Sequence, residues 1–181
     1  MLGSLLPIAA MLLLHGSQVR FTTQSRSTAK ALHGALGGTW TGTLRYRDYQ
    51  DSTRFVSLPT TLQGTTAADS TGVRLDFTYD DGPGKTVRSS DAFSLDAAAR
   101  ALVWGSSDGK RPPSTFSVTQ FTGGKPFTLV VERDGEDDDR KARIRETLSV
   151  NGAELRILKE VRFDAKAPWV FRHEYRLRHS S

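Results

Sequence analysis

Apolar and polar residues alternate along most of the chain after Gly38. Between residues 39 and 49, Trp40, Leu44 and Tyr46 alternate with threonines and arginines, a period of two that predicts a half-buried β-strand. Residues 73–79 repeat this pattern. Further runs of the same kind predict strands at residues 86–95, 101–104, 115–121, 127–132, 142–150, 154–163 and 169–178.

Turn-forming residues separate many of these runs. They are Asp81-Gly82-Pro83-Gly84, Asp108-Gly109, Gly123-Gly124, Asp134-Gly135 and Asn151-Gly152. Short strands joined by tight turns, with no long helical pattern, indicate an all-β sandwich or barrel. Consecutive hairpins favour the barrel, because closure removes exposed strand edges. We therefore expect one domain at residues 37–181, a closed antiparallel up-and-down barrel of about eight to ten strands.

A different segment precedes the barrel. Residues 5–14 (LLPIAAMLLL) form an apolar run that is shorter than the roughly 20 residues needed to span a bilayer but has the length of a signal-peptide core. We expect a signal peptide at residues 1–16, a periplasmic or secreted protein, and no transmembrane span; the alternative is a disordered tail or a misassigned start codon. Residues 17–36, rich in Ser, Thr and Gln, are expected to be a linker with a helical turn at residues 28–36.

The last three strands carry the sharpest structural prediction. Asn151-Gly152 is typical of a two-residue type I′ turn, which pairs Val150 with Ala153 and Glu146 with Ile157. If the chain returns after Pro168, His173 lies opposite Lys159. The residues then expected to face the interior are Ala142, Ile144, Glu146, Leu148, Val150, Leu155, Ile157, Lys159, Val161, Trp169, Phe171, His173, Tyr175 and Leu177.

Four polar side chains fall on this inner face: Glu146, Lys159, His173 and Tyr175. A charge inside a barrel is costly unless it is paired, so we expect Glu146 and Lys159 to neutralise one another directly or through water. Replacing Glu146 by Gln should then destabilise the fold strongly. A few polar groups in an apolar cavity are also typical of a ligand site, whereas an ion-pair network that fills the barrel is the structural alternative.

The net charge of +5 is concentrated near the C-terminus, where 11 Lys or Arg follow residue 139 against 5 Asp or Glu. The outward row expected on the last strand is Val170, Arg172, Glu174, Arg176 and Arg178. Because it lacks the interleaved aromatic residues of single-strand binders, we expect a basic outer wall and no nucleic-acid partner. The acidic run at residues 136–139 is expected to form a solvated hairpin tip.

Several kinds of chemistry are excluded by the residues present. The chain has no cysteine, which removes disulfides and thiolate sites. No second ligand at useful spacing accompanies His173, so neither a metal nor a haem cofactor is expected. The segment from Gly105 to Gly109 matches G-x-S-x-G, but Pro112 and Pro113 follow where a nucleophile elbow requires a helix.

The opening of the barrel segment, Gly38-Thr39-Trp40-Thr41-Gly42, resembles the G-x-W start of the lipocalin and fatty-acid-binding-protein (calycin) superfamily. The whole pattern is similar to an exported lipocalin-like bacterial family. The resemblance implies a calycin-like barrel in which Trp40 closes one end and an arginine, Arg172, Arg176 or Arg178, stacks across it. It also implies a small hydrophobic or amphipathic ligand inside the barrel.

We therefore expect an exported lipocalin-like barrel that binds such a ligand. Two alternatives are a filled barrel that serves as a structural or interaction domain, and an enzyme that uses Glu146, Lys159 and His173 as acid/base groups. The oligomeric state stays open. The expected ligand-binding residues are Trp40, Tyr46, Phe77, Trp104, Glu146, Lys159, His173 and Tyr175.

Overall fold

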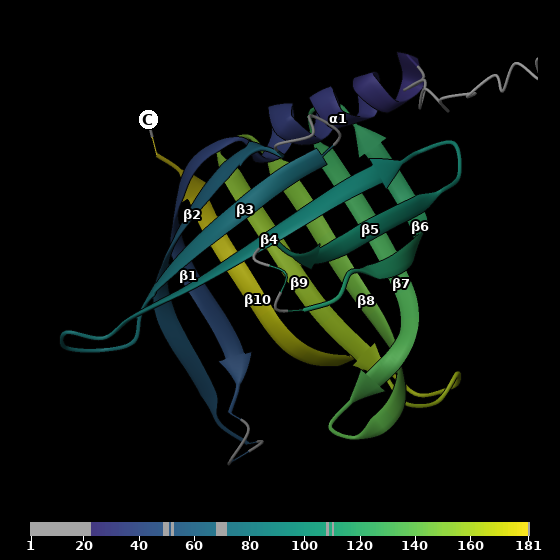
Figure 1. The fold of residues 1–181 in the computed structure, drawn as a ribbon. Coiled ribbons are helices and arrows are strands. Elements are labelled where there is room, and N and C mark those ends of the chain that lie inside the picture. The colour runs from purple at the N-terminus through teal and green to yellow at the C-terminus, as the bar shows by residue number, and fades with distance from the viewer. Residues whose placement is uncertain are drawn as a thin grey trace, which may run out of the picture.

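A computed structural model describes residues 23–48, 51, 53–67, 72–107, 109 and 111–180. The elements in this part of the chain are α1 (Thr23–Leu36), β1 (Gly38–Arg47), β2 (Phe55–Thr66), β3 (Gly72–Asp80), β4 (Thr86–Asp96), β5 (Ala101–Ser106), β6 (Ser114–Gly123), β7 (Phe127–Asp137), β8 (Arg140–Asn151), β9 (Glu154–Arg162) and β10 (Val170–His179). Each strand pairs antiparallel with its neighbours in sequence, and β1 pairs with β10. The fold is thus a closed up-and-down barrel of ten strands, as the alternating pattern predicts (Figure 1).

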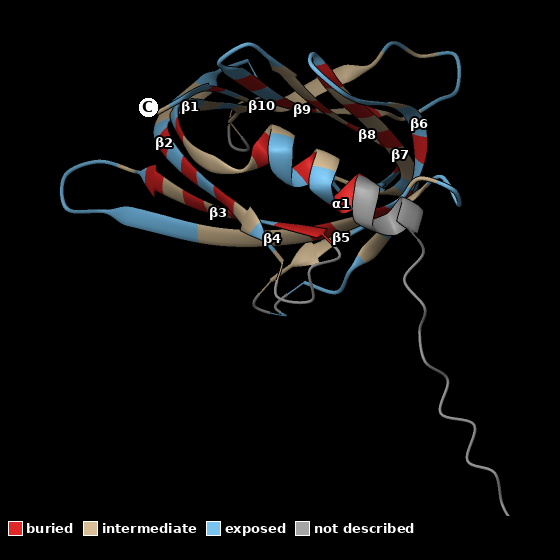
Figure 2. Cartoon of the chain, turned by 90° about the horizontal axis from the view of Figure 1, so that it is seen from above, coloured by how far each residue is buried: buried red, intermediate tan, exposed pale blue. Residues whose placement is uncertain are grey.

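Helix α1 covers one end of this barrel. It lies across the opening when the molecule is viewed from above (Figure 2), and Leu32 and Leu36 are fully buried. The helix approaches β2 so closely that a Cβ atom at Gly64 would lie 1.9 Å from the carbonyl oxygen of Leu36. Only glycine fits at this contact, which sets how deeply the helix sits in the barrel mouth.

The apolar core fills the half of the barrel under α1, which we call the helix half. Its fully buried side chains come from α1 and from the upper parts of the strands, and they include Leu32, Leu36, Leu62, Leu75, Leu102, Leu129, Leu148 and Leu177. Those on strands alternate with exposed or half-buried residues, as period-two patterning requires. No helix in the described part of the chain is long and apolar enough to cross a membrane.

The N-terminal expectations are met only in part by the described residues. The helical turn expected at residues 28–36 belongs to a longer helix, so the expected linker overlaps α1 from residue 23 onward. The proposed signal peptide at residues 1–16 lies outside the described residues. Trp40 does lie at the covered end, where its Nε1 donates to the Leu36 carbonyl at 3.1 Å.

The arginine expected across Trp40 is not there. The His179 ring contacts Trp40 edge-on instead, with ring centroids 4.8 Å apart. Arg176 and Arg178 lie on the outer wall, where they pair with Glu174 and Glu154, and Arg172 pairs with Asp137 nearer the opposite end.

Strand β2 is not predicted by the alternating pattern, because Pro59 interrupts a Thr-rich run. Proline cannot donate to a sheet ladder and normally marks an edge or a break. In the barrel, Pro59 pairs with Thr43 of β1, whereas the pairing of β2 with β3 begins at Thr60. Pro59 therefore occupies a part of β2 that has a neighbour on one side only, where a missing N–H is tolerated.

Two hairpin turns differ from the prediction. The turn between β7 and β8 lies at Asp138 and Asp139, which have φ angles of 50° and 56°, so the acidic run is the hairpin tip as expected. Asp134 and Gly135, however, lie within β7 and pair with Arg143 and Ala142. The local Asp-Gly signal is overridden because continuing the ladder pairs several more residues.

The turn between β8 and β9 is formed by Gly152 and Ala153, so Val150 pairs with Leu155 and not with Ala153. Gly152 has a φ of +59°, which suits the first position of a type II′ turn. The register therefore moves by two residues and every side chain keeps its predicted face. Glu146 now lies directly opposite Lys159.

A bulge in β10 also corrects the predicted facing. The pairing of β10 with β9 shifts between Phe171 and His173, so Phe171 lies opposite Glu160 on the outer face. Trp169 also lies outside, where Arg145 covers its ring. Beyond the bulge, the predicted pairing of His173 with Lys159 and of Tyr175 with Ile157 is confirmed.

Candidate functional site

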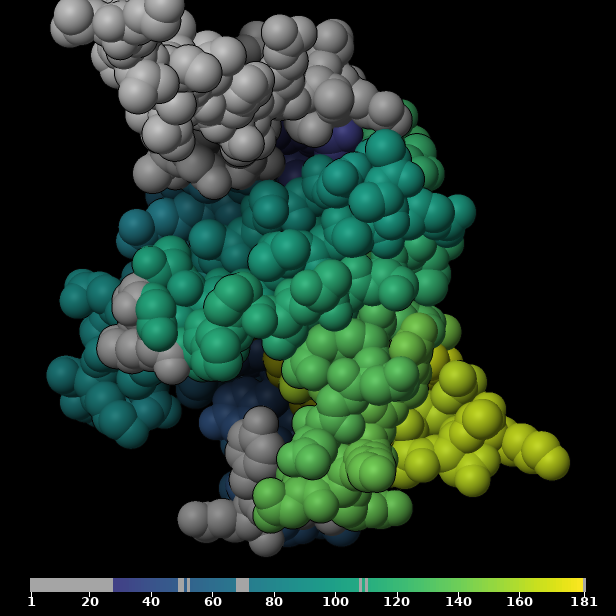
Figure 3. All heavy atoms as spheres, turned by 45° about the vertical axis from the view of Figure 1, so that its right-hand side comes forward, coloured from purple at the N-terminus to yellow at the C-terminus, as the bar shows by residue number. Residues whose placement is uncertain are grey.

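The wall of the barrel is incomplete in the half farther from α1. Strand β5 ends at Ser106 and β6 begins at Ser114, and only four residue pairs join them. Residues 86–90 of β4 and 133–137 of β7 therefore have no strand between them. A cavity of about 730 Å³ opens here. Figure 3 shows the hollow between the β5–β6 segment and the green β7–β8 hairpin, with yellow β10 behind it.

The cavity has an apolar side and a polar side. Its apolar lining comes from inward residues of β3, β5, β6, β8 and β9: Phe77, Trp104, Phe116, Ile144 and Ile157. Its polar lining includes Tyr79, Ser89, Asp91, Arg133, Glu146, Lys159, His173 and Tyr175. A cavity of this size with a few convergent polar groups is typical of a small-molecule site.

Six of the eight residues expected to bind a ligand line this cavity: Phe77, Trp104, Glu146, Lys159, His173 and Tyr175. The other two lie elsewhere. Trp40 is buried under α1, and Tyr46 pairs with His173 in the β1–β10 register without lining the cavity. Phe171, which the sequence predicts to face the interior, is on the outer face.

Arg133 and Asp91 also line the cavity, although neither is among the interior residues that the alternating pattern predicts. Arg133 continues the inward row of Leu129 and Val131 on β7, and Asp91 shares the inward row of Phe93 on β4. Extending each alternating run past its last apolar member would have placed both in the interior.

Glu146 is buried and lacks a partner. Its side chain makes no hydrogen bond or ion pair with any residue that the structure describes, and its Oε2 is fully shielded from solvent. Burial raises the pKa of Glu146 to about 8, although the charge of Lys159 acts in the opposite direction. At neutral pH the carboxyl group is therefore mainly protonated and can both donate and accept a hydrogen bond. The expected direct pairing with Lys159 is not observed.

Lys159 and His173 lie side by side next to Glu146. The ammonium group of Lys159 reaches Asp137 at 4.0 Å, and its side chain is 26% exposed. Burial and the nearby charge of Lys159 lower the pKa of His173 to about 4. His173 is therefore neutral at physiological pH, while Lys159 supplies positive charge to the cavity.

Arg133 supplies a second cation. Its guanidinium lies 5.2 Å from the centre of the Phe116 ring, and one terminal N–H donates to the Asp134 carbonyl at 3.2 Å. Its Nε is buried and finds no acceptor among the described residues. A buried donor without an acceptor is costly and uncommon in folded proteins.

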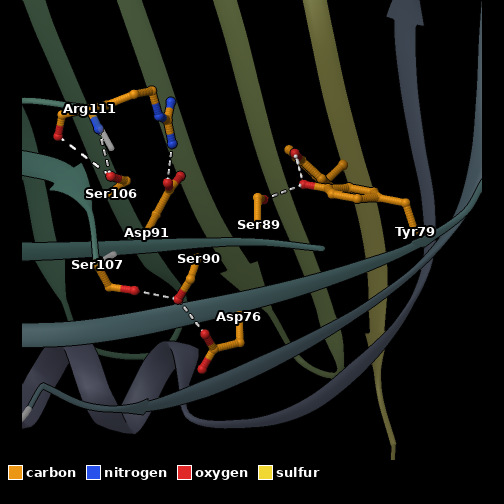
Figure 4. Close-up of polar contacts among 9 residues, drawn as sticks. Asp76, Tyr79, Ser89, Ser90, Asp91, Ser106, Ser107 and Arg111 are labelled. Atoms are coloured by element: carbon orange, nitrogen blue, oxygen red, sulfur yellow. Dashed lines mark hydrogen bonds and ion pairs between the residues drawn. The ribbon is translucent and has the colours of Figure 1, made fainter. Parts of the chain in front are cut away.

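Neutral hydroxyl groups complete the polar side. The Tyr79 hydroxyl lies 2.9 Å from that of Tyr175 and 3.0 Å from Ser89 Oγ. Burial raises the pKa of both tyrosines, so both stay protonated. Nearer the solvent, Arg111 pairs with Asp91 across the cavity mouth; Figure 4 shows these two side chains pointing toward each other and Tyr79 beside Ser89.

Within the described residues, Glu146, Lys159 and His173 do not form a proton relay among themselves. No hydrogen bond or ion pair joins Glu146, Lys159 and His173 in the described residues; they surround a space as separate groups. The described residues contain no group of three or more His, Asp or Glu arranged to hold a metal ion. Comparison with protein-family models and with curated proteins finds no match to this sequence.

Proposed function

We propose that the protein is a lipocalin-like binding barrel that holds a small amphipathic molecule with an anionic end. One observation carries the proposal: Glu146 Oε2 and Arg133 Nε are both buried without a partner, and both residues line the same cavity. Buried polar atoms are normally hydrogen-bonded. A ligand that accepts from Arg133 and exchanges a hydrogen bond with Glu146 satisfies both.

The charges in the cavity favour an anion. Arg133 and Lys159 are cationic, whereas Glu146 and His173 are neutral at pH 7 because of their shifted pKa values. An anionic group near Arg133 and Lys159 gains charge-assisted hydrogen bonds. The rings of Phe77, Trp104 and Phe116 offer the rest of the molecule an apolar surface, which supports an amphipathic ligand over a plain hydrocarbon.

Two dyes that share aromatic rings test this proposal. Anilinonaphthalene sulfonate is anionic, and phenylnaphthylamine is its uncharged counterpart. We expect the anionic dye to bind with a dissociation constant in the micromolar range by calorimetry, and the uncharged dye to bind about tenfold more weakly.

Variants of a cavity residue and of an outer-wall residue test whether the dye binds in the cavity. Arg133→Gln should weaken the anionic dye by about tenfold or more and leave the uncharged dye within about twofold, because it removes one charged donor. Arg178→Gln, on the outer wall with a side chain 76% exposed, is the matched control and should change neither. Equal binding of both dyes, or equal loss in both variants, would contradict an anion-binding cavity.

We also propose that the protein is exported from the cytoplasm. This location rests on the signal peptide expected at residues 1–16. N-terminal sequencing of protein purified from the culture medium or periplasm should begin near residue 17 or beyond. Recovery of the intact N-terminus in the cytoplasm alone would argue against export and would leave the binding site untouched.

A further inference from the structure

A group of arginines and aromatic rings lies on the outer wall, on the side away from the cavity mouth. It consists of Arg45 and Arg47 on β1, Phe55 on β2, Arg162 on β9, Trp169 just before β10, and Phe171 at the start of β10; we call it the arginine–aromatic surface. The Arg45 guanidinium is 4.1 Å from the Phe55 ring centre and 5.6 Å from that of Phe171. The Arg162 guanidinium lies 4.7 Å from the Trp169 ring.

The β10 bulge creates this surface. Without the shift between Phe171 and His173, both Trp169 and Phe171 would face the interior, as the alternating pattern predicts. With it, Phe171 pairs with Glu160 on the outside. The ground for expecting no nucleic-acid partner, a lack of outward aromatic residues among the basic ones, is therefore removed.

These arginines differ from others on the same wall in having no acidic partner. Arg143 pairs with Glu132, Arg156 and Arg176 with Glu174, and Arg178 with Glu154. Arg45, Arg47 and Arg162 make no ion pair within the described residues, and the Nε atoms of Arg47 and Arg162 find no acceptor. Positive charge that is not neutralised is thus concentrated where the rings are.

Neighbouring charges reduce this concentration only slightly. Arg145 also stacks on Trp169, at 3.8 Å, while pairing with Glu132. The acids on this face include Glu160, between Phe171 and Arg145 in the register, and Glu174, which lies opposite Arg45 and pairs with Arg156 and Arg176. The surface and its immediate neighbours therefore carry more arginines than carboxylates, which attracts a polyanion.

We infer that the arginine–aromatic surface binds single-stranded nucleic acid. Guanidinium groups without carboxylate partners suit phosphates, and the guanidinium planes and the exposed Phe55 ring can stack on unpaired bases. The described residues of this surface lie on strands and in the segment before β10, so they offer no helix that could enter a duplex groove. A membrane is less suited, because arginines cover the rings and Phe55, 42% exposed, is the one large apolar side chain of this surface that is exposed.

Fluorescence anisotropy with a labelled oligothymidylate of about 12 nucleotides tests the inference. We expect micromolar binding at low salt, with log affinity falling linearly as log salt rises. The variant R45Q/R47Q/R162Q should flatten that slope by about two, since each phosphate contact contributes about 0.7 for a single strand. The control R74Q/K85Q/R178Q removes the same charge from exposed positions on β3, in the β3–β4 turn and on β10, and should keep the slope.

Phe55→Ala separates stacking from charge. Phe55 is exposed, so the variant should fold normally, and it should weaken oligonucleotide binding roughly fivefold or more with an unchanged slope. Polyphosphate, which has no bases, should bind the native protein and F55A equally. Loss of oligonucleotide binding in the control variant, no effect of F55A, or binding to anionic vesicles without binding to the oligonucleotide would each overturn the inference.

Discussion

At the scale of single residues, Glu146 shows how position sets chemistry. The same side chain on the outer wall would be charged, whereas burial in the cavity raises its pKa to about 8. Lys159 lies opposite in the register but makes no ion pair with it, so the proton stays on the carboxyl group. Glu146 therefore acts as a neutral hydrogen-bonding group at pH 7. The sequence alone predicts that replacing Glu146 by Gln destabilises the fold, whereas a neutral carboxyl group predicts the opposite.

Glu146→Gln is predicted to stabilise the protein increasingly as pH rises. A carboxyl with a folded pKa near 8 and an ordinary unfolded pKa costs nothing in acid, where both states hold the proton. Above the unfolded value the native protein loses stability, by up to about 1.4 kcal/mol per pH unit, until the folded pKa is reached. Glutamine avoids this loss because it resembles the protonated acid.

Urea unfolding of the native protein and E146Q across this pH range measures the difference. The two proteins should be equally stable near pH 4 and differ most at about pH 8. Glu154→Gln, at the exposed turn of the neighbouring strand, should show no comparable rise. A less stable E146Q at pH 8 would mean that the carboxylate is charged and paired with Lys159.

At the scale of elements, the hairpin turns are placed by geometry that short dipeptide signals do not specify. The turn after β7 uses Asp138 and Asp139 with left-handed backbone angles, which favour glycine or asparagine over aspartate. Asp138 has a compensating role, since its carboxylate pairs with Arg172 at 2.8 Å. Asp139 has no such ion pair within the described residues.

Asp139→Gly should therefore stabilise the protein by roughly 0.5–1 kcal/mol, because Asp139 has a left-handed backbone conformation, with a φ of 56°, that glycine adopts without strain.

Gly152→Ala is the opposite change at the next hairpin. The φ angle of Gly152 is +59°, and a Cβ atom there meets nothing within 4 Å. It should destabilise by about 1 kcal/mol through backbone strain alone. Chemical unfolding of both variants checks the pair; changes of the same sign would show that these turns are not strained as described.

The alternating pattern predicted most strands, because one buried face requires a period of two whatever the turns do. It could not predict the β10 bulge, since one additional residue reverses the facing before it and no local signal marks the position. The bulge satisfies partners distant in sequence: Arg172 turns toward Asp137 of β7, and Phe171 stacks with Phe55 of β2. Strand β2 is not predicted for a related reason. A proline is tolerated at position 59 because this part of the strand pairs with β1 and not with β3, and the local sequence does not reveal that pairing.

At the scale of the whole molecule, the barrel is divided into two halves with different roles. The helix half is filled by apolar side chains and capped by α1. The other half contains the cavity, with Glu146, Lys159 and His173 in its lining. The six predicted ligand residues that line the cavity follow from the alternating pattern and from the predicted hairpin, because its register error of two residues leaves the facing of each side chain unchanged. The cavity itself depends on the short β5–β6 pairing, which no local pattern reveals.

Because of this division, we expect one core substitution to lower mainly the unfolding free energy and another to lower mainly the affinity for the dye. Leu148→Ala removes a fully buried side chain of the helix half and should cost about 2–5 kcal/mol of unfolding free energy, while the affinity for anilinonaphthalene sulfonate stays within about twofold. Trp104→Ala removes a half-buried ring from the cavity wall. It should cost less stability than Leu148→Ala but weaken the dye about tenfold or more, because the ring is an apolar contact surface for the ligand.

The decisive result is which variant loses more unfolding free energy and which loses more dye affinity, not the size of either loss. A barrel with one continuous core would lose stability and dye binding together in both variants, since relaxation around either cavity would spread through the lumen. A divided barrel keeps them apart, because the packed leucines under α1 do not line the cavity. Unfolding in urea and dye titration on the same preparations decide between these cases; loss of dye binding in L148A alone would show that the helix half, with Trp40 and α1, contains the ligand instead.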